Sequence, residues 1–256
     1  MHEGDAAAPT PAILVRGLKK FYGSKPAVDG VDLEVPRGSF FGFLGPNGAG
    51  KSTTIRMLTG LIPYDAGSIE ILGYKLPEQD LEIKRRVGLV PDESLLFDRL
   101  TGAEFLEFVG RMYGLTRPVA IERAHGLMDL FQLHVDRKMI AEYSKGMRKR
   151  VAMAASLIHH PELFLMDEPF EGVDAVGARL MKDILTDQVR RGATIFLTSH
   201  VLEVVERLCD RVAIINDGKI AVCRSMAELR ASGESLEDAF VRIVGAEHQM
   251  ERLDWL

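Results

Sequence analysis

The stretch GPNGAGKST, from Gly45 to Thr53, fits the phosphate-loop pattern G-x-x-x-x-G-K-[ST]. The apolar run Phe40 to Leu44 before it predicts a buried strand, and Thr53 to Leu61 after it predicts a helix. A loop between a strand and a helix can turn its N–H groups around an anion at the positive end of the helix dipole, because glycine has no Cβ to block the approach. We therefore expect a nucleoside triphosphate site here rather than a chance glycine-rich turn.

Two side chains of this loop have specific expected roles. Lys51 is expected to reach the outer phosphates and to assist catalysis, and the Ser52 hydroxyl is expected to ligate Mg²⁺. The residues expected to hold the nucleotide are Gly45, Asn47, Gly48, Ala49, Gly50, Lys51, Ser52 and Thr53.

Two carboxylates follow a second apolar run, Leu163 to Met166, which predicts another buried strand. Ligands of α/β sheets bind at the carboxyl ends of the strands, where Asp167 and Glu168 stand. Alone, this pair is typical of a solvated turn, but beside a phosphate loop it predicts a catalytic role. Asp167 is the expected Mg²⁺ ligand, and Glu168 is expected to orient or deprotonate the water that attacks the γ-phosphate.

A third strand, predicted from Thr194 to Thr198, ends in Ser199 and His200. This places an imidazole at the same edge of the sheet. A single histidine after a strand is usually a surface residue or lies beside a helix cap. Next to the other two clusters, His200 is expected to contact the γ-phosphate.

Composition limits the remaining possibilities. The 256 residues, 46% hydrophobic and 27% charged, can form one large domain or a domain with an insertion. The net charge of −5 gives no electrostatic footprint for nucleic acid, so no nucleic-acid partner is expected. Cys209 and Cys223 fit no metal or redox pattern and are interpreted as core residues in a reducing cytosol. No apolar run approaches the ~18 residues of a membrane span, so contact with a membrane is expected to go through another chain.

The order of patterns predicts an α/β fold: a phosphate-loop NTPase core with a mixed sheet flanked by helices, and an inserted helical subdomain. No strand pattern appears between Leu100 and His160. We expect a disordered tail at 1–11, the ATP-binding core at 12–92 and 161–223, the helical insertion at 93–160 and a C-terminal helical extension at 224–256. The other strands are predicted at Ala12–Val15, Val31–Val35, Ile69–Leu72, Val87–Val90, Val212–Ile215 and Ile220–Val222.

Further motifs complete a resemblance. Between the phosphate loop and the carboxylates lies YSKGMRKR, from Tyr143 to Arg150, and Gly172 to Asp174 follows the carboxylates. In this order, the motifs resemble the ATP-binding subunit of ABC transporters over Ile13 to about Val222. The family signature is L-S-G-G-Q, and this chain departs from it at Tyr143, Lys145 and Met147 while keeping Ser144 and Gly146.

The resemblance implies a subunit that binds ATP and Mg²⁺ and dimerises head to tail around two ATP molecules. Tyr22 matches the aromatic residue that stacks on adenine. Three residues match positions that complete the site of the opposing subunit, namely Ser144, Gly146 and Asp174. The basic run from Arg148 to Arg150 is expected to be a solvated helix face, with a source of positive charge near the phosphates as the alternative.

One departure concerns the metal. After the strand Val87–Val90 the family usually has Pro-Gln, whereas this chain has Pro91, Asp92 and Glu93. Asp92 is expected to take the glutamine's place as a Mg²⁺ ligand. Glu93 is the rival for this role, and a solvated turn is the alternative.

The resemblance is strongest to exporter-type ATPases that pair with a separate integral membrane subunit. The expected partners are a second copy or a related ATP-binding subunit and that membrane protein, and the expected location is the cytoplasmic face of the membrane. One alternative is a soluble ABC-type ATPase that acts on ribosomes or DNA. Another is a degenerate module that barely hydrolyses ATP, against which Glu168 and His200 argue.

Overall fold

Two β-sheets form the centre of the molecule. The computed structural model describes residues 10–92, 96–134 and 137–245. The smaller sheet has the order β2-β1-β4-β5, and the larger has the order β10-β9-β3-β8-β7-β6. Residues 1–9 of the expected N-terminal tail, Glu93, and the end of the C-terminal extension from 246 lie outside the described residues.

The smaller sheet is antiparallel throughout. Its strands are β1 (Ile13–Tyr22), β2 (Lys25–Val35), β4 (Ala66–Ile71) and β5 (Tyr74–Leu76). β1 and β2 form a hairpin much longer than their apolar runs predicted, because polar residues continue the pairing as far as Tyr22 and Lys25. β5 was not predicted, since only three residues form it.

The larger sheet is mixed, as expected. Its strands are β3 (Phe40–Leu44), β6 (Val87–Val90), β7 (Leu163–Met166), β8 (Thr194–Ser199), β9 (Arg211–Asn216) and β10 (Lys219–Ser225). Neighbouring strands are parallel except β9 and β10. Each predicted strand overlaps an observed one. The carboxyl ends of β3, β6, β7 and β8 therefore meet at one edge of the sheet.

The two faces of β3 pack into different layers of the core. Phe41 and Phe43 point toward the smaller sheet, where both rings lie against Phe196 of β8 with centroids 5.7 and 5.3 Å apart. On the opposite face, a Cβ on Gly42 would lie 2.7 Å from a methyl carbon of Val205 in α7 (Leu202–Leu208). The alternation of side chains along a strand thus fills a core on each side of the larger sheet.

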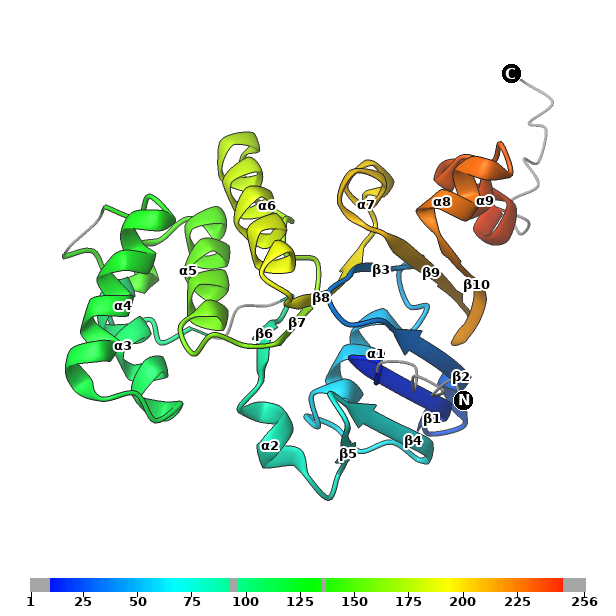
Figure 1. The fold of residues 1–256 in the computed structure, drawn as a ribbon, viewed down its shortest axis with the longest axis horizontal. Helices are drawn as coiled ribbons and strands as arrows, with labels where there is room; N and C mark the ends of the chain where they lie inside the picture. Colours follow the sequence, from blue (N-terminus) through cyan, green and yellow to red (C-terminus); the bar gives the residue numbers. More distant parts are fainter. Residues whose placement is uncertain (1–9, 93–95, 135–136, 246–256) are drawn as a thin grey trace, which may run out of the picture.

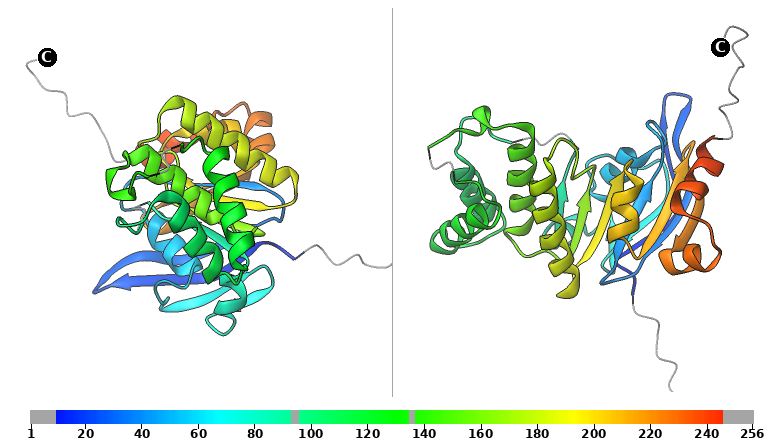
Figure 2. Two further views of the ribbon diagram at one scale, coloured as in Figure 1. Left: turned by 90° about the vertical axis from the view of Figure 1, so that its left-hand side faces the viewer. Right: turned by 90° about the horizontal axis from the view of Figure 1, so that it is seen from above.

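Helices cover these layers. α1 (Lys51–Leu58) packs in the core shared with the smaller sheet, and α2 (Asp80–Lys84) precedes β6. α6 (Ala175–Arg190) and α7 lie along the other face of the larger sheet, as Figures 1 and 2 show. Within the described ranges, no helix is long and apolar enough to cross a membrane.

The described residues between β6 and β7 are mainly helical, which confirms the inserted subdomain of the predicted fold class. It contains α3 (Gly102–Met112), α4 (Arg117–Leu130), the 3₁₀ turn η1 (Ile140–Glu142) and α5 (Lys145–Leu157). These helices project to one side of the sheets (Figure 1). α3 begins with a capping box between Thr101 and Glu104, and α5 begins at the cap Ser144.

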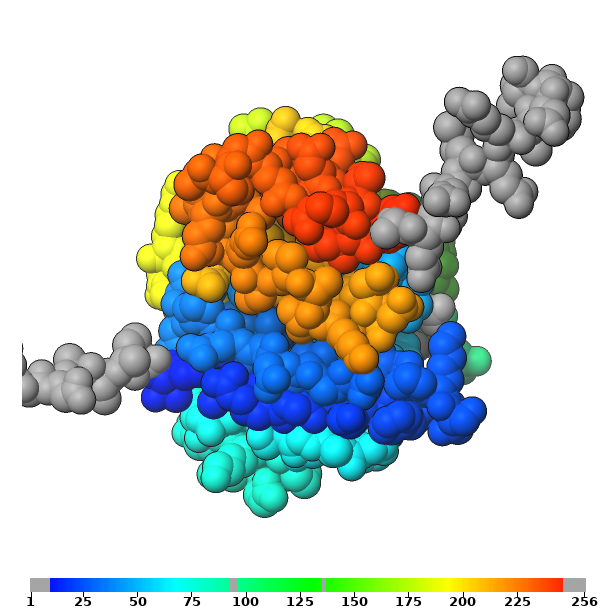
Figure 3. Space-filling model, turned by 90° about the vertical axis from the view of Figure 1, so that its right-hand side faces the viewer, coloured from blue at the N-terminus to red at the C-terminus, as the bar shows by residue number. Residues whose placement is uncertain are grey.

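The C-terminal part of the described chain forms α8 (Met226–Ala231) and α9 (Leu236–Val244). Figure 3 shows both helices on the same face of the molecule as the β1–β2 hairpin. Ala239 is buried, and Phe240 and Ile243 pack against the core beneath. Cys209 is buried as expected, but Cys223 is exposed, so its assignment to the core was wrong. The reason is that Cys223 lies on β10, the edge strand of the sheet.

Candidate active site

The phosphate loop is held closely by neighbouring strands. A Cβ on Gly45 would lie 2.4 Å from the carbonyl oxygen of Ile215. Gly50 caps α1 with φ +109°, and a Cβ there would lie 2.5 Å from the carbonyl oxygen of Ala27. Only glycine fits these two positions. α1 begins at Lys51, two residues before the predicted start, so the N-terminal N–H groups of the helix face the loop.

Lys51 lies inside this loop. Its side chain is almost completely buried, and Nζ donates hydrogen bonds to the carbonyl oxygens of Gly45 (2.7 Å) and Pro46 (3.1 Å). Burial lowers the pKa of Lys51, and the carboxylates of Glu168 and Asp167 oppose that shift. The ammonium group therefore stands between the loop carbonyls and the acidic edge of the sheet.

The two carboxylates after β7 are oriented by one hydroxyl. The Thr198 hydroxyl donates to Oδ1 of Asp167 (2.6 Å) and accepts from the N–H of Glu168 (3.0 Å). Glu168 has φ +46°, in the left-handed region, which turns its side chain away from the strand direction. This role of Thr198 was not predicted from the sequence. The available signal was a hydroxyl at the buried end of the strand beside β7.

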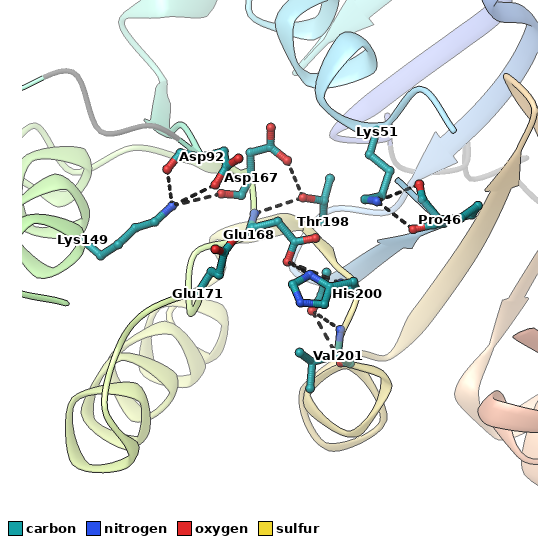
Figure 4. A network of polar contacts seen from close by, with 12 residues as sticks. Pro46, Lys51, Asp92, Lys149, Asp167, Glu168, Glu171, Thr198, His200 and Val201 are labelled. Atoms are coloured by element: carbon teal, nitrogen blue, oxygen red, sulfur yellow. Dashed lines mark hydrogen bonds and ion pairs between the residues drawn. The ribbon is translucent and has the colours of Figure 1, made fainter. Parts of the chain in front are cut away.

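His200 and Glu168, at the ends of β8 and β7, lie at the same edge of the sheet and are in direct contact. Nδ1 of His200 lies 3.0 Å from Oε2 of Glu168, and the same oxygen accepts the N–H of His200 (3.4 Å). Glu168 is mostly buried, with 13% of its side chain exposed, whereas the His200 side chain is 52% exposed. Figure 4 shows this pair between Thr198 and Val201. The carboxylate can thus act on a water while the imidazole faces solvent.

A cavity of about 750 Å³ brings these groups together. Its lining consists of Ala27, Gly45, Pro46, Asn47, Gly48, Gly50, Lys51, Ser52, Thr53, Asp92, Glu168, Glu171, His200 and Phe240. Ala49 and Asp167 are buried next to it. Tyr22 lies outside this lining, at the end of β1, and is 53% exposed. Ala27 and Phe240 were not expected, because they come from distant parts of the chain.

The residues at the cavity suit Mg²⁺. This ion prefers oxygen ligands and is usually held by one or two carboxylates together with substrate phosphates. The Asp167 carboxylate and the Ser52 hydroxyl supply such oxygens beside the loop. Within the described part of the chain, no group of three or more His, Cys, Asp and Glu side chains could hold a metal ion.

The three residues expected to act on an opposing subunit lie at helix starts. Oγ of Ser144 accepts the N–H of Met147 (3.2 Å) and caps α5, while Oδ1 of Asp174 accepts the N–H of Gly177 (2.8 Å) and caps α6. Gly146 lies against the backbone of Gly172, whose oxygen would be 3.2 Å from a Cβ at 146. None of the three lines the cavity of its own subunit.

The basic run on α5 is not a solvated face, so that expectation was wrong. Lys149 is 2% exposed, because it lies on the face of α5 that packs against the strand ends. Burial lowers the pKa of Lys149, opposed mainly by the nearby Asp92 carboxylate. Arg148 instead forms an ion pair with Asp98 (2.6 Å), and Arg150 donates to the carbonyl oxygen of Phe131 (3.1 Å).

Asp92 faces both the cavity and α5. It belongs to the lining, its side chain is 49% exposed, and Oδ1 lies 3.7 Å from Nζ of Lys149. Near the signature, Lys145 forms an ion pair with Glu171 (2.7 Å). Salt bridges therefore tie the start of α5 to the segments that follow β6 and β7.

Comparisons with known proteins agree with this geometry. A family model described as "ABC transporter" matches residues 28–171. The chain is 40% identical to the linearmycin resistance ATP-binding protein of Bacillus subtilis (strain 168), over 86% of this chain and 71% of that protein. It is also 40% identical to the daunorubicin/doxorubicin resistance ATP-binding protein of Streptomyces peucetius, over 88% and 68%.

Solved structures support the fold. The structure of an ATP-binding subunit of an ABC transporter is similar with a TM-score of 0.83 and 30% identity, over 91% of this chain and 99% of that one. A dimeric ATP-binding cassette in a post-hydrolysis state with ADP and Pi has the same fold, with a TM-score of 0.78 at 22% identity, over 84% and 98%. The family model and the first of these structures are of ABC transporters, which does not favour the ribosome or DNA alternative. The chain belongs to the ABC transporter family, as an ATP-hydrolysing ATP-binding subunit.

Proposed function

We propose that this subunit works as a head-to-tail dimer and powers export of a substrate through a separate integral membrane protein. The observation that carries the proposal is the single cavity in which Lys51, Glu168 and His200 meet. The direction of transport is supported by the relatives, whose names include resistance proteins and a Nod factor export ATP-binding protein.

Each group at the cavity has a role in this proposal. The loop N–H groups and Lys51 hold the phosphates, and Glu168 orients the attacking water and takes its proton. His200 contacts the γ-phosphate and keeps Glu168 in place through the contact of 3.0 Å. Mg²⁺, held by Ser52 and Asp167 with Asp92 as a further candidate, would neutralise charge on the phosphates. Tyr22 stacks on the adenine from the β1–β2 hairpin.

A second subunit completes the site. Ser144 is exposed at the start of α5, where N–H groups and the helix dipole favour an anion. Gly146, in the first turn of α5, has no side chain to block an approaching phosphate. In a head-to-tail pair, Ser144 and Gly146 cover the γ-phosphate held by the other subunit, and Asp174, exposed at the start of α6, links the two sites.

Mixing two inactive variants tests this composite site. Lys51→Ala removes the phosphate contact, and Ser144→Arg blocks the covering surface. In a mixed dimer, one of the two sites keeps an intact Lys51 and an intact Ser144, so we expect up to about half of the parent ATPase rate per dimer. Hydrolysis that stays at the level of the single variants, although heterodimers are proven by tandem-tag purification, would show that sites are not shared.

The membrane protein is proposed to contact the helical insertion. Phe97, Phe108 and Met112 are 51%, 42% and 71% exposed there, and the rings of Phe97 and Phe108 lie 5.2 Å apart. A groove of about 450 Å³ runs beside them, lined by Leu100, Glu104, Glu107, Phe108, Arg111 and Met112. An exposed apolar surface with a charged rim suits a partner helix. This contact would hold the subunit at the cytoplasmic face of the membrane.

The domain division follows from these roles. We propose that 12–92 with 161–223 bind nucleotide, that 93–160 contact the membrane protein, and that 224–256 extend the core. Phe108→Asp is expected to abolish co-purification with the membrane partner, without changing basal ATPase activity. Leu81→Asp is the matched control, because Leu81 is 65% exposed on α2 of the core. Equal loss in both variants, or none in Phe108→Asp, would contradict this contact surface.

A further inference from the structure

Lys149 is a buried charge whose position the roles above do not explain. It lies on α5 one turn after Gly146, and both residues are buried. On the face of α5 that they share, Gly146 packs against Gly172 at one end. At the other end of this face, Lys149 packs against the strand ends. A buried lysine is costly unless its ammonium group is fully paired, so its partners indicate what the residue does.

Among the described residues, the hydrogen-bond and ion-pair partners of the ammonium group are all oxygens. Nζ lies 2.6 Å from the carbonyl oxygen of Asp92, 3.3 Å from that of Pro91 and 3.5 Å from that of Asp167. The Asp92 carboxylate is 3.7 Å away. An ammonium group has three donors and no acceptor, which matches three carbonyl acceptors. Figure 4 shows Lys149 reaching from α5 toward Asp92 and Asp167.

These partners follow two neighbouring parallel strands. Val90 at the end of β6 pairs with Met166 at the end of β7, and the N–H of Asp167 donates to the carbonyl oxygen of Val90 (2.8 Å). Pro91 and Asp167 are the next residues along each strand. Lys149 therefore joins both strand ends to the helix that starts at Ser144.

We propose that Lys149 is a positioning residue, which fixes the signature end of α5 relative to the acidic strand ends that carry Asp92, Asp167 and Glu168. It acts through these segments and does not itself touch the nucleotide. The proposal rests on the proposed function, because it supposes that Ser144 and Glu168 serve one reaction. It deepens that function by naming the side chain that links the two halves of the site within a subunit.

Two substitutions distinguish the charge of Lys149 from its ability to donate hydrogen bonds. Lys149→Met keeps the length of the stem and removes all donors. Lys149→Gln removes the charge and keeps an amide that can donate to the carbonyls. Arg148→Met is the matched control, since it removes a salt bridge from the neighbouring position of the same helix, with its partner Asp98 away from the strand ends. Lys149→Met leaves the carbonyl oxygens of Pro91, Asp92 and Asp167 without this donor, so thermal melting first verifies that the variant is folded.

The first measurement is hydrogen–deuterium exchange of the free protein, which needs no nucleotide. We expect Lys149→Met to accelerate exchange in peptides covering 87–92 and 163–168, Lys149→Gln to do so less, and Arg148→Met to leave these peptides unchanged. Because hydrogen–deuterium exchange is independent of hydrolysis, it tests the positioning role of Lys149 even if the proposed ATPase mechanism is wrong. Unchanged exchange at both strand ends in a folded Lys149→Met variant overturns the proposal.

The second measurement is steady-state hydrolysis. Lys149→Met is expected to lower kcat about tenfold with ATP affinity within about twofold, a pattern that loss of ground-state binding would not give. Lys149→Gln is expected to recover part of the loss, and Arg148→Met to match the parent. A Lys149→Met variant that has the parent kcat, or that loses affinity and kcat equally, contradicts a positioning role. Failure of the parent to hydrolyse ATP would instead count against the proposed function.

Discussion

Lys51 and Lys149 are two buried lysines on opposite sides of Asp167. Both donate to main-chain carbonyl oxygens, and burial lowers the pKa of each while Asp167 opposes the shift. The partners of Lys51, Gly45 and Pro46, lie six and five residues before it in the sequence. Lys149 instead meets Pro91 and Asp92, 58 and 57 residues away, and Asp167, 18 residues away.

Lys51 thus belongs to a local motif, whereas Lys149 makes tertiary contacts between distant segments. The hydrogen bonds of Lys51 lie within the phosphate loop, so its substitution should act on nucleotide binding. The signature side depends on how the helical insertion meets the strand ends, so substitutions there should act on turnover and leave affinity almost unchanged. The variants below test this division, in order of decreasing effect on hydrolysis.

Lys51→Met is expected to have the largest effect. Removing the charge that meets the phosphates should lower ATP turnover by about a thousandfold. It should also weaken ATP binding by about tenfold to a hundredfold. Binding is measured with a fluorescent ATP analogue, with Lys149→Met as the comparison. If both lysine variants lose affinity equally, the division between the two regions fails.

Glu168→Gln, between the two regions, is expected to affect chemistry alone. The amide keeps an oxygen for the N–H of His200 but cannot take a proton, so kcat should fall at least about a hundredfold while ATP still binds. ATP should then accumulate in a dimer visible by size-exclusion chromatography. Glu162→Gln, at the other end of β7, is the control. A Glu168→Gln protein that hydrolyses ATP at the parent rate would remove Glu168 from its assigned role.

Thr198→Val sharpens the comparison at the strand ends. It removes the hydroxyl that orients Asp167 and the N–H of Glu168, so we expect kcat to fall about tenfold and stability by about 1–3 kcal/mol. Thr194→Val at the start of β8 is matched, because its buried hydroxyl accepts the N–H of Gly38 (2.9 Å). It should cost similar stability without the loss of turnover. Equal kcat in both variants would mean that the hydroxyl of Thr198 supports only the fold.

Substitution of His159 is expected to have the smallest effect on hydrolysis. It tests the contact between the helical insertion and the core. Its ring stacks on Tyr113 with centroids 3.6 Å apart, and Nε2 lies 3.1 Å from the carbonyl oxygen of Val87. Burial lowers the pKa of His159 to about 4. The folded state disfavours the protonated ring of His159. The contribution of the neutral ring to the free energy of unfolding is therefore complete above pH 6.5. It falls by up to about 3 kcal/mol as the pH falls toward 4.

Urea unfolding across this pH range measures the effect. In His159→Phe, the free energy of unfolding should fall less between pH 6.5 and 4 than in the parent, and ATP turnover at pH 7.5 should be unchanged. His134→Gln is the control, since the His134 side chain is 70% exposed, and it should keep the decline of the parent. If the free energy of unfolding of His159→Phe depends on pH as it does in the parent, groups other than His159 cause its decline.

The sequence predicted the regions whose contacts are local or periodic. The strands of the larger sheet followed from apolar runs, the phosphate loop followed from its motif, and the placement of Glu168 and His200 at one sheet edge followed from the strands that they end. Lys149, Phe240 and Thr198 were missed, because their roles depend on contacts between distant segments that a single sequence does not reveal. Lys149 in particular follows Arg148 in a basic run, and only the packing face of α5 distinguishes the two.

Phe240 has a consequence for synthesis of the chain. It lies on α9, which packs near β9, and it lines the cavity together with Ala27 and the phosphate loop. A ribosome releases β3, α1 and Lys51 long before it releases α9. The loop segment thus emerges early, whereas Ile215 of β9, against which Gly45 packs, and Phe240 of the cavity lining emerge late. A nascent chain that still lacks α9 has the loop without the side chain of Phe240, so the complete lining of the nucleotide site is among the last parts of the subunit to form.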